Sequence, residues 1–162
     1  MQAWPFLQSI LLLTLTNGAP VVAKRLLGGR LAFPLDAGAR FIDGQPLFGP
    51  SKTIRGVVFS IVTTAVVAPL LGLSLAAGGL VAALAMIGDL FSSFVKRRLK
   101  FPSSSQSIGL DQVPESLLPL LVCRETLSLT FLDVAIVVAI FVAGELILSR
   151  LLYDLHVRDE PY

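Results

Sequence analysis

The sequence predicts an all-α integral membrane protein, and three observations support this fold class. Of the 162 residues, 54% are hydrophobic and only 15% are charged, and the mean hydropathy is +0.80. A soluble domain of this length cannot bury so much apolar surface, so lipid must solvate part of the chain. The charged residues also cluster between long apolar stretches, unlike the alternation typical of an amphipathic surface helix. We expect one transmembrane domain over residues 1–162.

The first apolar stretch covers residues 4–23 and has the length of a membrane span. It lacks the basic start of a secretory signal, so we expect it to stay in the protein, with cleavage after its small residues as the alternative. Asn17, Gly18 and Pro20 interrupt the stretch and predict a bend or a break near its inner end. A polar loop, residues 24–53, is expected to follow.

Residues 54–75 and 76–95 predict a helical hairpin, joined by a turn of small residues from Gly72 to Gly79. A second polar loop, residues 96–112, follows this hairpin. Residues 113–129 are apolar only in part. They predict either a weak fourth span or a segment that re-enters the same face of the membrane.

Residues 132–152 predict the last span. Lysine and arginine residues near the ends of spans usually stay in the cytoplasm. With five spans, all of the 13 lysines and arginines except Arg124 lie on the side of the C-terminus. We therefore expect the N-terminus outside, the C-terminus inside and both long loops in the cytoplasm. Four spans would place the C-terminal arginines on the opposite side.

The composition also limits the chemistry. Cys123 is the only cysteine and His156 is the only histidine. An internal disulfide, a cysteine-rich zinc site and a serine-histidine-aspartate triad are therefore not expected, and any metal ion would need oxygen ligands. The net charge of +2 arises from cations beside the spans, and no nucleic-acid partner is expected.

Asp89 lies inside the third apolar stretch, about two helical turns before a basic cluster. On a helix, Asp89 shares one face with Ser93, Lys96 and Arg97, which follow at positions i+4, i+7 and i+8. Ionisable groups inside a membrane are unfavourable and usually functional. The alternative is an internal salt bridge that helps the helix to end.

A loop punctuated by glycines runs from Asp43 to Gly56 and brings Lys52 and Arg55 to the start of the second span. Glycines let the backbone approach a ligand, and the amides of a helix N-terminus attract anions. The two cations would add charge for phosphate oxygens. The pattern is not a Walker loop, and such a loop equally often serves only as a topology signal and a lipid contact.

Asp111 and Gln112 follow the second loop, and Glu115 lies nearby. A second carboxylate beside Asp89 predicts a magnesium site, because Mg²⁺ prefers oxygen ligands, keeps waters and bridges to substrate phosphates. The alternative is a charge that stabilises a helix N-terminus. The inventory of acids, cations and hydroxyls favours phosphoryl or nucleotidyl transfer, because an ionised phosphate acceptor needs no general base.

Three motifs occur in a fixed order along the chain. They are Lys52-Thr53-x-Arg55-Gly56, Gly88-Asp89-Leu90-x-Ser92-Ser93-Phe94-x-Lys96-Arg97-Arg98-Leu99 and Leu110-Asp111-Gln112. Together they resemble the CDP-archaeol synthase family, which is related to the CDP-diacylglycerol synthases, and the likeness covers most of the chain. One departure is clear: the family often has an acid three positions after the last aspartate, where this chain has Pro114 and then Glu115.

The resemblance implies an enzyme of the cytoplasmic membrane that uses CTP and Mg²⁺ to convert a lipid phosphate into a CDP-activated lipid. It implies catalytic roles for Lys52, Asp89, Lys96 and Asp111, with the two aspartates binding the metal. The predicted substrate-binding residues are Asp43, Thr53, Arg55, Ser93, Arg97, Arg98 and Gln112. The lipid tails would lie against the spans, with the phosphate in a polar pocket between the second and third helices. A homodimer is a further possibility.

A different class of function is compatible with the same residues. A small transporter or a subunit of a membrane complex would use Asp89 and Glu145 for ion coupling, with the basic loops serving only orientation and lipid contact. Glu145 is also explained by a polar contact between helices. The sequence leaves open whether the lipid acceptor carries ether-linked or ester-linked chains.

Overall fold

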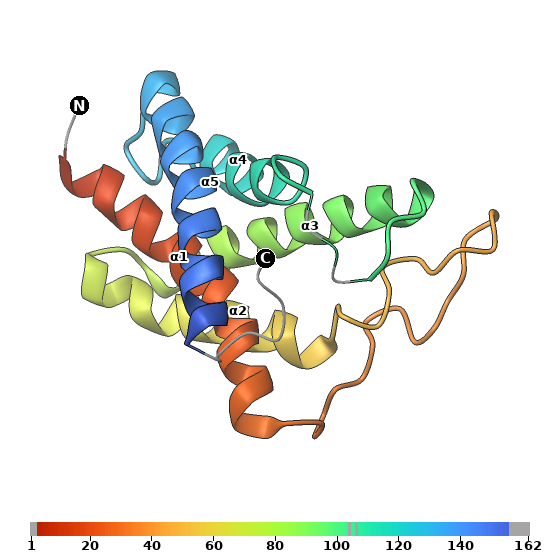
Figure 1. Cartoon of the computed structure of the whole chain (residues 1–162). Helices are drawn as coiled ribbons and strands as arrows, with labels where there is room; N and C mark the ends of the chain where they lie inside the picture. Colours follow the sequence, from red (N-terminus) through yellow and green to blue (C-terminus); the bar gives the residue numbers. More distant parts are fainter. Residues whose placement is uncertain (1–2, 104, 106, 156–162) are drawn as a thin grey trace.

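The computed structural model describes residues 3–103, 105 and 107–155. Within them the chain forms five α-helices and one short 3-10 helix (Figure 1). The elements are α1 (Ala3–Leu27), α2 (Ile54–Val67), η1 (Ala68–Leu71), α3 (Leu75–Arg98), α4 (Gln112–Val122) and α5 (Phe131–Asp154). The predicted all-helical fold is confirmed. His156 and Arg158, which is one of the C-terminal arginines, lie outside the described residues.

Four segments of the described chain are long and apolar enough to cross a membrane. They are Ala3–Leu27, Ile54–Leu71, Leu75–Arg98 and Phe131–Leu151. The chain is therefore a multi-pass membrane protein. The predicted fourth span, residues 113–129, overlaps α4, which has 11 residues. At about 1.5 Å per residue, α4 covers roughly half of a hydrocarbon core about 30 Å thick, so this helix is too short to cross alone.

The first helix is continuous, so of the two predicted alternatives the helix shows the bend and not the break (Figure 1). Pro20 lies inside α1 and has no N–H for the carbonyl of Thr16, four residues earlier. That carbonyl instead accepts a hydrogen bond from Ser60 Oγ at 2.7 Å. Figure 1 shows the axis of α1 changing direction in its second half, as a proline inside a helix predicts. The helix ends at Leu27, and the next residue, Gly28, has a φ of 53°.

The turn of the α2–α3 hairpin is shorter than predicted. Ser74 caps the N-terminus of α3 by accepting a hydrogen bond from the amide of Ala77 at 3.0 Å, so the helix begins at Leu75. Gly78 and Gly79, expected in the turn, therefore lie inside α3. A Cβ on Gly78 would lie 2.4 Å from the Cβ of Ala68. This glycine serves close packing of the hairpin and not the reversal of the chain.

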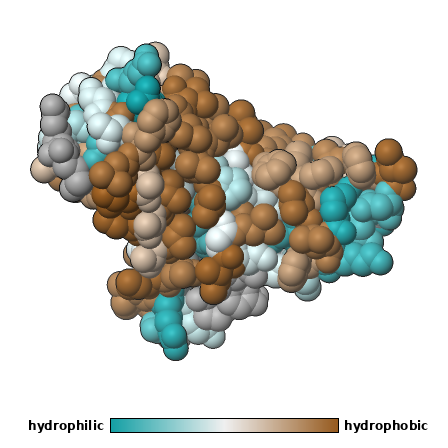
Figure 2. All heavy atoms as spheres, turned by 90° about the horizontal axis from the view of Figure 1, so that it is seen from above, coloured by the Kyte–Doolittle hydropathy of each residue, from teal (hydrophilic) through white to brown (hydrophobic). Residues whose placement is uncertain are grey.

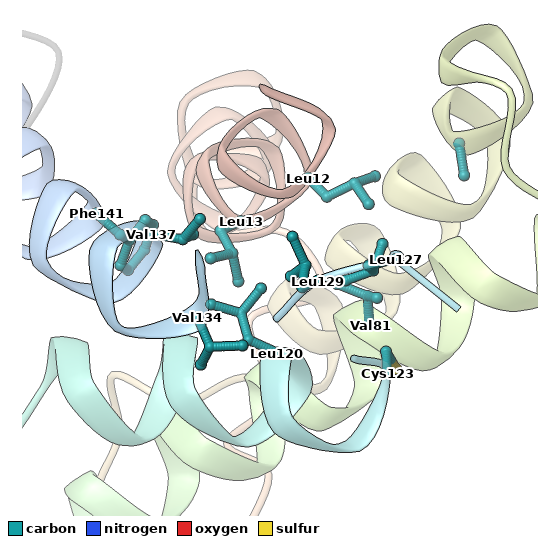
Figure 3. Packing of buried hydrophobic residues seen from close by; sticks show 11 residues of the cluster. Leu12, Leu13, Val81, Leu120, Cys123, Leu127, Leu129, Val134, Val137 and Phe141 are labelled. Carbon is teal, nitrogen blue, oxygen red and sulfur yellow. The ribbon is translucent and has the colours of Figure 1, made fainter. Parts of the chain in front are cut away.

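An apolar core joins α1, α3, α4 and α5. Leu12 and Leu13 of α1 meet Val81 of α3, Leu120 of α4 and Val137 of α5, and all five are almost fully buried (Figure 3). Other large apolar side chains point outward, and Figure 2 shows an apolar surface over most of the helical region. These exposed groups lie on the candidate spans, where lipid would cover them.

A hydrophilic patch lies at one end of the hairpin. Figure 2 shows teal residues at the right-hand end, where Figure 1 places the long loop between α1 and α2 and the end of α3. The loop is tied to α3 by an ion pair between Arg98 Nε and Asp43 Oδ2 at 3.1 Å. It also holds two isolated antiparallel bridges, Pro34 with Thr53 and Arg40 with Pro46. The loop thus has a defined conformation that positions Lys52.

Candidate active site

A polar cavity of 260 Å³ lies where α1, α3, α4 and α5 meet the loop before α2. The four predicted catalytic residues all line it: Lys52, Asp89, Lys96 and Asp111. Three of the predicted substrate-binding residues do so as well, namely Ser93, Arg97 and Gln112. These predicted residues come from three separate parts of the sequence, and the fold places all of them around the same cavity. The common helical face expected for Asp89, Ser93, Lys96 and Arg97 is confirmed.

Lys52 and Asp89 form an ion pair in this cavity. Lys52 Nζ donates to both carboxylate oxygens of Asp89, at 2.7 and 2.6 Å. The backbone around Lys52 is fixed, because its carbonyl accepts from the amide of Leu35 at 2.8 Å and Thr53 caps α2. Burial alone would lower the pKa of Lys52, but Asp89 raises it, followed by Glu115 and Asp111. The net shift is upward, so Lys52 carries its charge.

Lys96 and Asp111 form a second ion pair, with Lys96 Nζ 2.6 Å from Asp111 Oδ1. Lys96 also donates to the carbonyl of Ser105 at 2.8 Å. The other carboxylate oxygen of Asp111 accepts from the amide of Ser107 at 2.9 Å. Asp111 precedes α4 without making a side-chain cap bond to it, so its carboxylate organises the loop and the cavity.

Arg97 and Arg98 are adjacent but point to different surroundings. Arg97 lines the cavity and donates to Ser103 Oγ at 2.9 Å. Arg98 packs at 4.8 Å from the ring centres of both Phe41 and Phe94, and it donates to the carbonyl of Pro46 at 2.6 Å. Successive helical residues differ by about 100° in direction, which explains the separation.

Four predicted substrate-binding residues lie outside the lining of the polar cavity. Arg98 and Asp43 bind each other and fasten the loop to α3. Arg55 donates to the carbonyl of Gly28 at 2.8 Å, beyond the end of α1. Thr53 caps α2 by accepting from the amide of Gly56 at 3.2 Å, and it lines an adjoining cavity of 170 Å³ between α1, α2 and α3. The structure thus gives these four side chains contacts within the protein.

Several residues outside the predicted catalytic and substrate-binding sets also line the polar cavity. Asn17, which the sequence marks as a helix interruption, lines this cavity and two adjoining ones. Glu115 and Glu145 also line the polar cavity, and Glu115 is only 4% exposed. The common signal is a polar residue within a largely apolar helix. Ser51, beside Lys52, lines the cavity without any such signal.

An apolar groove of 140 Å³ between α1 and α5 adjoins the polar cavity. Ile10, Phe141 and Leu148 provide part of its apolar wall. Asn17 and Glu145 line both the groove and the polar cavity. The polar site therefore opens sideways onto an apolar surface of the spans.

The cavity's donor atoms fit a magnesium ion. Asp89 and Asp111 supply carboxylate oxygens, and Glu115 Oε1 is buried without a hydrogen-bond partner. In the described part of the chain, no three His, Cys, Asp or Glu side chains gather closely enough to hold a metal ion. Mg²⁺ needs only one or two protein carboxylates, since substrate phosphates and water complete its coordination. The two aspartates meet that need, although each now binds a lysine.

Comparison with known proteins identifies the family. The sequence profile of the CarS-like family, CDP-archaeol synthase, matches residues 6–78 and 74–162. This chain belongs to the CDP-archaeol synthase family. The resemblance drawn from the three motifs is therefore confirmed, and so is the enzyme class, a CTP-dependent cytidylyltransferase. The family does not support the transporter alternative.

Two CDP-archaeol synthases illustrate the similarity. The one from Pyrobaculum calidifontis is 40% identical over 111 residues, covering 65% of this chain and 66% of the relative. The one from Pyrobaculum islandicum is 30% identical over 153 residues, covering 90% of each. This chain thus spans about two thirds of the first relative and nine tenths of the second.

A solved structure supports the fold of this CDP-archaeol synthase family member. It is described as an intramembrane enzyme for archaeal membrane lipids biosynthesis. The TM-score is 0.70 at 26% sequence identity, and the match covers 85% of this chain and 90% of the other. The helical arrangement described above is therefore that of an enzyme that works within a membrane.

Proposed function

We propose that this chain transfers the cytidylyl group of CTP to a lipid phosphate, forming a CDP-activated membrane lipid and pyrophosphate. The observation that carries the proposal is the junction of the polar cavity with the apolar groove at Asn17 and Glu145. A nucleotide triphosphate needs cations, and a lipid needs an apolar surface beside them. The names of the relatives favour an archaeol-type acceptor with ether-linked isoprenoid chains.

The reaction is an in-line displacement at phosphorus. An oxygen of the lipid phosphate attacks the α-phosphorus of CTP, the bond from that phosphorus to the bridging oxygen breaks, and pyrophosphate leaves with the electron pair. The lipid phosphate needs no general base, because its second pKa is about 6 and it is largely ionised near neutral pH. The chain therefore acts by positioning and by charge neutralisation.

The cations of the cavity carry out that neutralisation. Lys52, Lys96 and Arg97 converge on one space and present N–H donors of the kind that bind phosphate oxygens. Asp89 and Asp111 would hold Mg²⁺. When bound, that ion would offset the charge that develops on the leaving pyrophosphate.

The lipid would approach from the side. The groove between α1 and α5 accommodates a hydrocarbon chain, and its polar end lies beside the cavity. The adjoining cavity between α1, α2 and α3 shares Lys52 and Asp89 with the site. It offers the lipid phosphate a position near the one expected from the sequence, between the second and third helices.

The proposed location is the cytoplasmic face of the cell membrane. The loops that build the site contain most of the chain's lysines and arginines, and such loops usually stay in the cytoplasm. This orientation also places the site where CTP is made. A homodimer remains a prediction that rests on small residues. One of them, Gly78, is already used in packing within the chain.

The direct test supplies purified protein with radiolabelled CTP, Mg²⁺ and one of two lipid phosphates. One acceptor carries ether-linked isoprenoid chains and the other carries ester-linked acyl chains. We expect a labelled CDP-lipid and an equal amount of pyrophosphate with the ether lipid, and less product with the ester lipid. Hydrolysis of CTP without lipid product, or no reaction with either acceptor, would refute the proposed activity.

A further inference from the structure

Asn17 is a polar residue of α1 that lies where three cavities meet. It lines the polar cavity, the apolar groove between α1 and α5, and the adjoining cavity between α1, α2 and α3. Val21 also lines all three, and residues four apart lie on the same face of a helix. One face of α1 therefore borders this junction, and Asn17 supplies a polar group there.

The side-chain amide of Asn17 makes no hydrogen bond within the described part of the chain. The residue is half-buried in a candidate membrane span, and asparagine is unfavourable in the interior of a helix. Its amide offers two N–H donors and one carbonyl acceptor. Polar groups inside a span usually bind a neighbouring helix or face a functional site. Because Asn17 binds no neighbouring helix, the second role remains.

The backbone on either side of Asn17 is fixed against α2. Directly before Asn17, the carbonyl of Thr16 accepts a hydrogen bond from Ser60 Oγ at 2.7 Å. After it, Pro20 packs against Gly56, where an added Cβ would lie 3.3 Å from the Cβ of Pro20. The amide is therefore attached to a rigid segment of α1, as expected of a group that positions a ligand.

The part of a lipid phosphate that would pass Asn17 is its glycerol. Lys52, Lys96 and Arg97 suit the phosphate, and the apolar groove suits the chains. The section between them carries neutral linkage oxygens, which accept hydrogen bonds and need a donor once they have lost water. Ser149 lines both spaces as well, but it is only 3% exposed. The side-chain NH2 of Asn17 is thus a suitable donor at this point.

We propose that Asn17 is a positioning residue for the lipid acceptor, and that its side-chain NH2 donates to a glycerol linkage oxygen of the lipid phosphate. This inference rests on the proposed function and names a contact within the same site. The hydrogen bond holds the glycerol at the junction, so the phosphate points toward the cations and does not slide along the groove. Removal of either the donor or the acceptor oxygen deletes the same interaction, so the two changes are not additive.

The test changes the protein and the acceptor in turn. Formation of CDP-lipid by the purified full chain is measured with two acceptors. One is a glycerol lipid phosphate with ether-linked isoprenoid chains, and the other is the phosphate monoester of a single isoprenoid alcohol, which lacks the glycerol. If the alcohol phosphate is not turned over, its inhibition constant against the glycerol lipid is measured in place of its kcat/KM.

We expect Asn17→Leu to lower kcat/KM for the glycerol lipid about 10-fold, which corresponds to the loss of one hydrogen bond. The value for the alcohol phosphate and the affinity for CTP with Mg²⁺ should change less than about twofold, because neither ligand uses the amide. Asn17→Ala, which removes the amide without adding an apolar branch, should show the same selective loss. Thr63→Val is the control, since Thr63 is a polar residue of α2 outside the described walls of all three cavities.

Three results would overturn the role of Asn17 alone. They are wild-type kcat/KM for the glycerol lipid in both variants, an equal loss with both acceptors, and a loss of CTP affinity as large as the loss in kcat/KM. The second and third are expected of a purely structural role, which does not distinguish one ligand from another. A wild-type protein that forms no CDP-lipid from either acceptor would overturn the proposed function together with this inference.

Discussion

Lys52 Nζ lies within 2.7 Å of both carboxylate oxygens of Asp89, so a loop residue neutralises the acidic residue of α3. Lys96 forms a second ion pair in the same cavity, with its Nζ 2.6 Å from Asp111 Oδ1. Each residue proposed to hold the metal is thus engaged by a residue proposed to bind phosphate. Entry of a nucleotide with its cation would exchange these partners, with the lysines turning to phosphate and the aspartates to the ion.

Asp89→Asn should abolish formation of the CDP-lipid. The amide keeps the shape of the side chain but loses the charge needed for a cation, and removal of one strong electrostatic group commonly lowers turnover by about 100-fold or more. The measurement is product formed from radiolabelled CTP, with Asp111→Asn expected to behave alike. Glu125→Gln, outside the cavity, should keep wild-type turnover. Retention of more than half of the activity by Asp89→Asn would contradict the metal-binding role.

Lys52→Met should have opposite effects on the two ligands. Without Lys52 the carboxylate of Asp89 is free, so Mn²⁺ should bind more tightly in the absence of nucleotide, by roughly 10-fold. CTP should bind about 10-fold more weakly, because a charge-assisted contact is lost. Calorimetric titration with each ligand measures both effects, and Lys100→Met is the control for a general loss of positive charge. Weaker binding of both ligands would argue against the exchange of partners.

Arg98→Ala should loosen the loop instead of removing a substrate contact. The change deletes the ion pair with Asp43 and the packing between Phe41 and Phe94. We expect faster proteolysis within residues 28–53 and a larger change in the KM for CTP than in kcat. Arg98→Lys should recover only part of the protection, since lysine lacks the planar group that fits between two rings. Unchanged proteolysis with a lower kcat would favour direct contact with the substrate.

The loop should also become less stable in acid because of Asp36. Burial would raise the pKa of Asp36, but hydrogen bonds from the amides of Gly49, Phe48 and Gly38 lower it below its usual value. A lowered pKa in the folded state gives stability that is complete above the unfolded value, about 3.9, and is lost as the pH falls through the folded value. The protection of residues 36–49 against hydrogen exchange, relative to an unfolded chain at the same pH, should decrease below about pH 4. Asp36→Asn should remove most of that pH dependence, and an equal dependence in the variant would contradict this role.

The helices and much of the site could be predicted from the sequence. Helical spacing alone predicts that one face of α3 carries Asp89, Ser93, Lys96 and Arg97. Arg98 could not be placed, because its partners Phe41 and Asp43 come from a loop whose path depends on tertiary contacts. The sequence pattern alone likewise could not distinguish a glycine that lies in a turn from a glycine that lies in the contact between two helices.

Gly88→Ala should separate the two helices that supply the acids of the site. The added methyl group would lie 2.2 Å from the carbonyl oxygen of Pro114, which is backbone and cannot rotate away. Overpacking of this kind lowers the free energy of unfolding by about 1–3 kcal/mol, and activity should fall further because Asp89 moves relative to Asp111. Gly79→Ala is the matched control in the same helix, because its Cβ would meet that of Ala65 at an ordinary 3.7 Å. Thermal unfolding and CDP-lipid formation measure the two effects. If Gly88→Ala matched Gly79→Ala in both, close contact between α3 and α4 would not be what aligns the carboxylates.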